Sequence, residues 1–176
     1  MRFLIILAFL SSDAYSSIKI RAREHYEVHS ITQGDEKSVY RGFSNTGNVW
    51  DEKPYAYSVG LAISPILGSS KAADTSDDPY GSRLTLVNIG LEYKLFPHEL
   101  LAQSYTRIGA GYSQMLTEQG PDNSRGFNLY SAIGYELPLK NFGLALELGY
   151  RYTKLDNDIS INSFLPSIGF HFYKVI

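Results

Sequence analysis

Residues 142 to 153 alternate at every position between a bulky residue and a small or charged one. Successive side chains of a β-strand point to opposite faces, so this pattern predicts a strand with one large apolar face and one small, partly charged face. The bulky row is Phe142, Leu144, Leu146, Leu148, Tyr150 and Tyr152, and the other row is Gly143, Ala145, Glu147, Gly149, Arg151 and Thr153. The direction in which each face points decides the class of protein.

The same alternation recurs along the chain with varying clarity. We predict eight strands. Seven are at about residues 18–29, 37–44, 55–64, 87–95, 103–114, 127–137 and 142–153, and the last follows Asp156, Asn157 and Asp158 and alternates clearly at 167–172. Polar connections rich in Gly, Pro, Asn and Asp are predicted at 45–54, 65–82 and 117–126, and short turns at 97–99 and 138–141. From the third strand onward, long connections tend to alternate with short turns, as in outer-membrane barrels.

Composition narrows the class further. The chain has 176 residues, enough for one domain, and a net charge of -2, which gives no basic surface for nucleic acid. It has no cysteine, which excludes disulfides and thiolate metal sites. Fourteen tyrosines and fifteen glycines, with 19% charged residues, favour many short strands that form a barrel.

The N-terminus has the layout of a secretory signal peptide. Arg2 precedes an apolar run at residues 3–10, and small and polar residues follow. Cleavage after Ala14 or after Ser16 fits this pattern; we take residues 1–16 as the signal peptide and 17–176 as one barrel domain. A buried N-terminal strand is the alternative. The run is too short for a membrane-spanning helix, which needs about 20 apolar residues, so a membrane location requires a closed barrel.

With this signal, this alternation and a last strand carrying Phe170 and Phe172, residues 17–176 resemble the small eight-stranded outer-membrane β-barrels of the OmpA and OmpX type. The resemblance implies an all-β, eight-stranded antiparallel up-and-down transmembrane β-barrel in a bacterial outer membrane, monomeric, with both termini on the periplasmic side. It also implies recognition of the C-terminal strand by the barrel-assembly machinery. Such families commonly end in an aromatic residue, whereas this chain ends in Ile176 with Lys174 before it. No residues remain for a periplasmic peptidoglycan-binding domain.

Alternation alone leaves open which face points outward, because a soluble lipocalin-like barrel would put its apolar face inside. Side-chain size favours the membrane. An eight-stranded barrel has an interior just wide enough for side chains to fill. Gly, Ala, Ser and scattered charges suit that lumen, and the Leu, Phe and Tyr face suits lipid and the interfacial aromatic girdles.

Charges on the small faces balance and predict a network of ion pairs in the lumen. In a rough register Arg107 is diagonal to both Glu92 and Glu136, a spacing that long side chains bridge. A polar plug that holds the barrel together is the favoured interpretation, and an ion path is the alternative. The predicted network comprises Glu92, Lys94, Arg107, Glu136, Glu147 and Arg151.

The sequence gives little sign of an enzyme or a metal site. Some outer-membrane barrels are lipid A deacylases, with a His and a Ser two residues apart and a Glu, but His29 and Ser30 are adjacent and point to opposite faces. His171 follows Ser167 on one face with no evident acid partner. His25, Glu27 and His29 share a face, yet Lys19, Arg21 and Arg23 beside them disfavour a cation. Asp74, Asp77 and Asp78 lack EF-hand spacing. We predict no catalytic residues, no metal and no cofactor.

The function predicted from the sequence is therefore that of a small non-enzymatic outer-membrane barrel. It has a structural role in the envelope or a surface-interaction role through the connections at 65–82 and 117–126. A narrow pore for small solutes and a soluble lipocalin-like binder are the alternatives.

Overall fold

The computed structural model describes residues 17–52, 57–64, 70–72, 83–95, 103–117, 123–139 and 142–172. The predicted signal peptide and the C-terminal residues Lys174 and Ile176 lie outside these residues. Within them the chain forms nine β-strands, and no helix is long and apolar enough to span a membrane. The strands are β1 (Ser17–Gln33), β2 (Glu36–Glu52), β3 (Tyr57–Ser64), β4 (Ser70–Ala72), β5 (Arg83–Leu95), β6 (Ser104–Thr117), β7 (Ser124–Pro138), β8 (Phe142–Leu155) and β9 (Ile159–Phe172).

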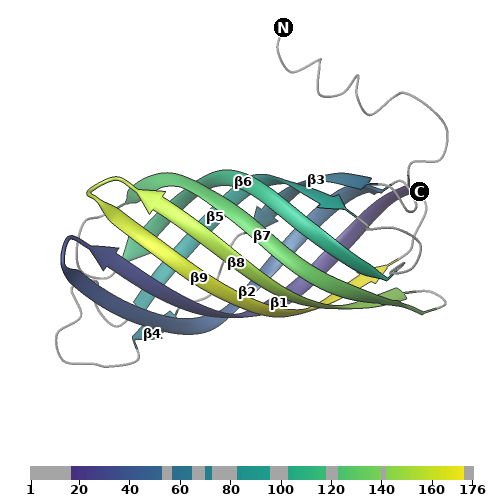
Figure 1. The fold of residues 1–176 in the computed structure, drawn as a ribbon, viewed down its shortest axis with the longest axis horizontal. Coiled ribbons are helices and arrows are strands. Elements are labelled where there is room, and N and C mark those ends of the chain that lie inside the picture. The colour runs from purple at the N-terminus through teal and green to yellow at the C-terminus, as the bar shows by residue number, and fades with distance from the viewer. Residues whose placement is uncertain are drawn as a thin grey trace, which may run out of the picture.

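The strands form one antiparallel sheet that winds into a barrel (Figure 1). Apart from β3 and β4, strands that follow each other in the chain pair with each other, and β1 pairs with β2 along one edge and with β9 along the other. The pairings therefore run in a ring through eight strands, and the short β4 makes two further pairings, with β2 and β5, beyond the end of β3. The prediction of an eight-stranded antiparallel up-and-down barrel is confirmed.

Several predicted boundaries are wrong because the strands are longer than the sequence pattern indicated. Residues 45–52 belong to β2 and pair with β1 along their whole length, so they are not a connection. Asn45, Gly47 and Asn48 are poor strand formers, but a continuous ladder satisfies their backbone groups and overrides this propensity. In the same way β7 begins earlier than predicted, at Ser124, whereas β9 begins at Ile159, directly after the predicted turn at 156–158.

The connection predicted at 65–82 contains β4, which pairs Tyr40 with Ala72 and Ser70 with Leu84. The other residues of this connection, including the three aspartates at 74, 77 and 78, lie outside the described residues. β3 and β4 therefore lie one after the other between β2 and β5, and each pairs with both of these strands.

Two tight hairpin turns lie at one end of the barrel, seen on the left in Figure 1. Gly34 joins β1 to β2 with a φ of 57°. Asn157 and Asp158 join β8 to β9 with φ values of 55° and 61°. Positive φ at both central residues is the signature of a type I′ turn, whose twist matches that of the flanking strands. We call this the hairpin end; the first residues of β1 and the last of β9 lie at the opposite end.

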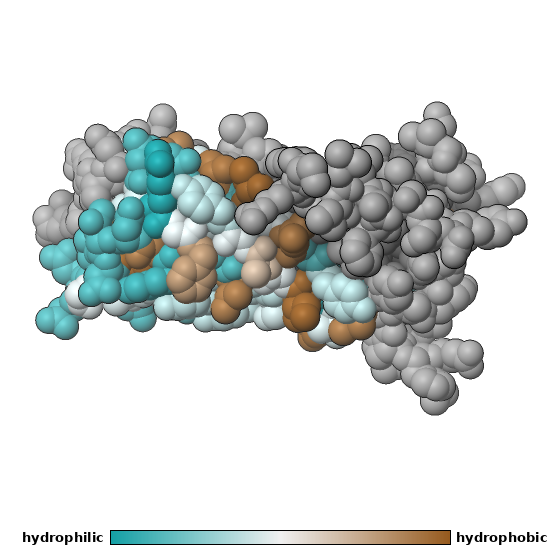
Figure 2. Space-filling model, turned by 90° about the horizontal axis from the view of Figure 1, so that it is seen from above, coloured by the Kyte–Doolittle hydropathy of each residue, from teal (hydrophilic) through white to brown (hydrophobic). Residues whose placement is uncertain are grey.

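Most of the large apolar side chains of the described strands point outward. Leu91 and Ile133 are each 63% exposed, and Leu148 is 51% exposed. Figure 2 shows hydrophobic side chains over the middle of the barrel and hydrophilic ones at the hairpin end. The outward direction of the bulky row is therefore confirmed, and the inward apolar face of a lipocalin-like barrel is not observed. An apolar band of this kind faces lipid in membrane barrels.

The inward row combines glycines with large polar side chains from the neighbouring strand. A Cβ atom added at Gly134 would lie 2.2 Å from the ring of Tyr105, its direct partner on β6. Gly149 makes room for Tyr130 in the same way, and Gly169 for Arg23. These glycines are required because a narrow lumen has no other space for the rings and the guanidinium group.

A second set of inward residues is apolar and lies at the hairpin end. All are at most 3% exposed and form one cluster, which we call the apolar end cluster. Its members come from β1, β2, β5, β6, β8 and β9: Ile31, Tyr40, Leu84, Leu86, Met115, Leu155, Ile159 and Ile161.

Candidate functional site

All six residues of the predicted network point into the lumen and are at most 7% exposed. Together with Arg23, Tyr105 and Tyr130 they form a layer of buried charges and hydroxyls, which we call the charged band. Four strands, β5 to β8, supply the predicted six, and β1 adds Arg23. The contacts show which of them the fold brings together.

Glu147 of β8 is the centre of the charged band. Its Oε1 atom lies 3.3 Å from Arg23 Nη1 and 3.0 Å from Arg107 Nη2. The same oxygen accepts a hydrogen bond of 2.6 Å from the Tyr130 hydroxyl, and Oε2 accepts one of 2.9 Å from Tyr105. Four donors from three strands, β1, β6 and β7, therefore converge on one carboxylate. Such charge-assisted hydrogen bonds are the stronger ones in proteins.

Arg107 also binds Glu92, with 3.1 Å between Nη1 and Oε2. The predicted diagonal to Glu92 is present, because Arg107 pairs directly with Lys94 on β5. The predicted diagonal to Glu136 is wrong. Arg107 lies opposite Ala132 on β7, four residues from Glu136, and binds Glu147 instead.

Glu136 binds Lys94 at the side of the band away from the hairpin end. Lys94 Nζ lies 2.9 Å from Glu136 Oε2 and 4.1 Å from the centre of the Tyr105 ring. The ring face attracts the ammonium group and adds to the ion pair.

Arg151 is the exception among the six. No ion pair joins it to any described residue, and its Nε and Nη1 atoms have no hydrogen-bond partner there. Its guanidinium carbon lies 5.4 Å from the centre of the Tyr130 ring. Arg151 is thus held by a cation–π contact and by packing.

The sequence analysis missed three members of the band. Arg23 was placed on the polar face of the first strand, but its partner Glu147 is 124 residues away, and only the β1–β9 pairing brings them together. Tyr130 was placed on the small face, where a tyrosine among Gly, Ala and Asn was the available signal. Tyr105 lies near the uncertain start of its strand and gave no such signal.

A separate polar cluster lies between the charged band and the apolar end cluster. His29 Nδ1 shares a hydrogen bond of 2.7 Å with Ser163 Oγ, and His29 Nε2 lies 2.9 Å from Glu27 Oε2. Ser44 donates a hydrogen bond to the other oxygen of Glu27. Ser30 is on the opposite face from His29, as expected. The partner of His29 is Ser163, which is 134 residues away and therefore was not found from the sequence.

Ser163, His29 and Glu27 have the residue types of a hydrolase triad, but they are buried. Ser163 is 0% exposed, and His29 and Glu27 are each 2% exposed. A nucleophile needs space beside its oxygen for the reacting group, and none of these three residues lines the hollow in the barrel wall or the small cavity in the lumen. No group of three His, Asp or Glu side chains among the described residues is arranged to hold a metal ion.

A small cavity in the lumen lies among Asn88, Asn128, Tyr130 and Arg151. Its volume is about 20 Å³, enough for about one water molecule. Asn88 Nδ2 and two nitrogens of Arg151 lie in this region without a hydrogen-bond partner among the described residues. A much larger hollow, of about 810 Å³, lies across the barrel wall between Ser104 and Phe43.

Comparison with known proteins gives the fold. No family model matches the chain, and no curated protein matches it. Among solved structures, Neisserial surface protein A is similar, with a TM-score of 0.60 and 14% identity over 92% of this chain and 100% of that one. Ail, the attachment invasion locus protein of Yersinia pestis, solved with the heparin analogue sucrose octasulfate, has a TM-score of 0.57 and 14% identity over 89% and 99%. Both are small eight-stranded outer-membrane β-barrels, and this chain has their fold.

Proposed function

We propose that this chain is a non-enzymatic outer-membrane β-barrel with a structural or surface-interaction role, and that its lumen is plugged by side chains. The observation that carries the proposal is the filling of the lumen. The charged band and the apolar end cluster follow each other along the barrel, and the cavity between inward side chains holds about one water molecule.

The exposed apolar side chains on the outer face of the barrel support a membrane location. In water, an exposed apolar surface that extends over seven neighbouring strands would favour association. In a bilayer it faces acyl chains. The proposed partners are therefore outer-membrane lipid and, during assembly, the barrel-assembly machinery that recognises the C-terminal strand; the proposed state is a monomer. The connections at 65–82 and 117–126 are the proposed interaction surface.

Membrane fractionation followed by a heat-modifiability gel tests the location. We expect the protein in the outer-membrane fraction and a band that migrates faster when the sample is not boiled, because a folded barrel resists detergent. A soluble protein with a single band position would contradict the proposal.

The narrow pore is the alternative, and planar bilayer recording separates it from the plug. An ion that enters from the hairpin end meets the apolar end cluster, and hydrophobic constrictions exclude water and ions. We expect no steady conductance from the purified protein. Steady, large single-channel steps would overturn the plug.

The enzyme alternative rests on Ser163, His29 and Glu27. Their burial supports a structural role, in which the serine and the carboxylate satisfy the hydrogen-bonding groups of the histidine. We expect no lipid deacylation above background from the purified protein. Turnover that Ser163→Ala abolishes would establish an enzyme instead.

A further inference from the structure

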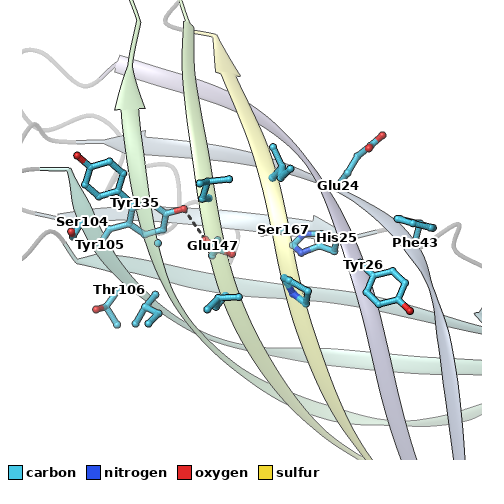
Figure 3. Close-up of a pocket in the computed structure, with 16 residues that line it drawn as sticks. Glu24, His25, Tyr26, Phe43, Ser104, Tyr105, Thr106, Tyr135, Glu147 and Ser167 are labelled. Carbon is cyan, nitrogen blue, oxygen red and sulfur yellow. Dashed lines mark hydrogen bonds between the residues drawn. The ribbon is translucent and has the colours of Figure 1, made fainter.

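The charged band contains one more cation than carboxylates. Its cations are Arg23, Lys94, Arg107 and Arg151, and its carboxylates are Glu92, Glu136 and Glu147. Each carboxylate is bound to one of the first three cations, at 2.9 to 3.3 Å. Figure 3 shows Tyr105 pointing toward Glu147, to which it also donates a hydrogen bond. Arg151 is the cation in excess, because no carboxylate of the described barrel pairs with it.

The burial of this excess charge is costly. Arg151 is 4% exposed, and a guanidinium group keeps its charge in proteins. The ring of Tyr130 attracts the guanidinium carbon from 5.4 Å, but Nε and Nη1 still have no hydrogen-bond partner among the described residues. A buried charge is tolerated when it is paired and its donors are satisfied. The group that satisfies Arg151 therefore comes from outside the charged band.

The small cavity of about 20 Å³ lies beside Arg151 and brings a further donor to it. Asn88 lines the same cavity, and the direction of its amide is fixed, because its Oδ1 atom accepts hydrogen bonds from Ser113 and Asn128. The Nδ2 atom of Asn88 has no partner among the described residues. Three nitrogen atoms of two buried side chains thus carry N–H groups that no described acceptor binds.

The two carboxylates nearest to this part of the lumen are held by other groups. Glu92 lines the cavity, but Arg107 Nη1 lies 3.1 Å from its Oε2. Along β5, Glu92 is four residues from Asn88, which is about 13 Å. Glu27 belongs to the polar cluster, where His29 Nε2 lies 2.9 Å from its Oε2. Neither carboxylate makes an ion pair with the excess cation, so its charge is not neutralised by contact.

The size of the cavity and the kind of groups around it favour a small anion. The cavity has room for one particle of about the size of a water molecule, which excludes phosphate, sulfate and organic acids. A water molecule in this place would also need acceptors for its own two protons. A halide ion donates no hydrogen bond and accepts N–H groups from every side, and it carries the charge that the band lacks.

We propose that the lumen binds a single chloride ion between Arg151 and Asn88. The ion accepts hydrogen bonds from Nε and Nη1 of the arginine and from Nδ2 of the amide. It is held and not conducted, because the apolar end cluster closes the lumen on one side and the charged band fills it on the other. The inference goes beyond the plug, since it makes the stability of the filled lumen depend on an anion from solution.

Urea unfolding of the full chain in micelles of an uncharged detergent tests the site, because a ligand that binds the folded state alone stabilises it. Sodium chloride is exchanged for sodium gluconate at constant ionic strength, since gluconate is too large for the cavity. We expect the ratio of folded to unfolded protein to rise with chloride, by up to about tenfold for each tenfold increase. A ratio that does not rise with chloride would contradict the site.

Two variants and a control separate the site from a general effect of the salt. Arg151→Met removes the charge together with its need for a counter-ion, and Asn88→Asp places a carboxylate beside the arginine. The chloride dependence should vanish in both, and the second variant serves if the first does not fold, which the heat-modifiable band reports. Arg125→Met removes an exposed arginine of β7 and should respond as the unchanged protein does. A dependence that persists in both lumen variants would refute the proposal.

Crystals of the unchanged protein grown with bromide in place of chloride locate the ion directly, because bromide scatters anomalously and water does not. We expect an anomalous peak within hydrogen-bond distance of Arg151 Nε and Asn88 Nδ2. A water molecule in the cavity, or bromide at exposed positions as an adventitious ion only, would rule the site out. Membrane fractionation does not depend on chloride, so a failure of the location and a failure of this site remain distinguishable.

Discussion

The charged band and the apolar end cluster occupy the same inward face of largely the same strands, yet they fill the lumen by opposite means. The charged band consists of groups that are each costly to bury alone and are held by specific partners, above all Glu147. The apolar end cluster contains no charge and excludes water by packing alone. Both regions fill the available space. The stability of the charged band depends on each ion-pair and hydrogen-bond partner, and the stability of the apolar end cluster depends on the total volume of its side chains.

This difference predicts how each region responds to substitution. Removal of one partner from the charged band leaves buried charges unpaired, and this is more costly than the pair itself is stabilising. Removal of methyl groups from the apolar end cluster leaves a cavity, whose cost depends on how far the neighbours relax. The comparison can be tested by four changes, which are given in order of decreasing expected effect.

Glu147→Ala should have the largest effect. It removes the acceptor shared by Arg23, Arg107 and two tyrosines, and we expect the free energy of unfolding to fall by about 3 to 5 kcal/mol. Urea unfolding of the protein in lipid vesicles measures it. Arg151→Met is the matched control, because Arg151 has no ion pair to lose, and we expect a loss below about 1.5 kcal/mol. Equal losses would mean that the band does not act as a network.

Leu84→Ala should follow. Leu84 is 0% exposed in the apolar end cluster, so we expect a loss of about 2 to 4 kcal/mol in the same measurement. Leu84→Met keeps the volume and should lose less than about 1.5 kcal/mol. If the two variants were equally unstable, shape rather than volume would control this region.

Gly134→Ala tests the fit between neighbouring strands inside the charged band. The new methyl group would collide with Tyr105 and displace the ring from Glu147, at a cost of about 1 to 3 kcal/mol. Tyr105→Ala removes the obstacle, so the double variant should lose less than the sum of the two single losses. Strict additivity would show that the ring and the glycine do not interact.

Asp158→Asn should have the smallest effect, because Asp158 is fully exposed in the β8–β9 turn. A hydrogen bond from Lys154 and its positive charge lower the pKa of Asp158 below its ordinary value. A lowered folded-state pKa adds stability above about pH 4, and this stability is lost as the pH falls through the depressed pKa. NMR titration of the Asp158 carboxyl should give that depressed value, and Lys154→Met should restore the ordinary one.

The alternation of β8 was enough to predict the barrel and the outward direction of its large side chains, since strand periodicity and the narrow lumen leave few solutions. The pattern also placed the six charged residues of the predicted network on the inward face, where they are buried. The partner of each charge depends on the strand register. The rough register drawn through the connection at 117–126 placed Glu136 diagonal to Arg107, and this was wrong. The apolar end cluster was missed because Leu84 and Leu86 precede the predicted strand at 87–95, and because Ile31, Met115 and Leu155 lie beyond the predicted ends of their strands. Ser163 and His29 come together only through the β1–β9 pairing. The residue pattern within a single strand cannot predict such a pairing.

The ring of pairings has a consequence for the order of assembly. Hairpin neighbours meet across short stretches of chain, as Leu144 and Phe170 do, whereas Ile20 must find Phe172 across about 150 residues. The entropy of closing this longer loop is greater by roughly 1.5 kcal/mol. The β1–β9 ladder also lacks two residue pairs at Pro166, which has no N–H to donate. We therefore expect the hairpins to form first and the pairing of β1 with β9 to be the rate-limiting step of folding.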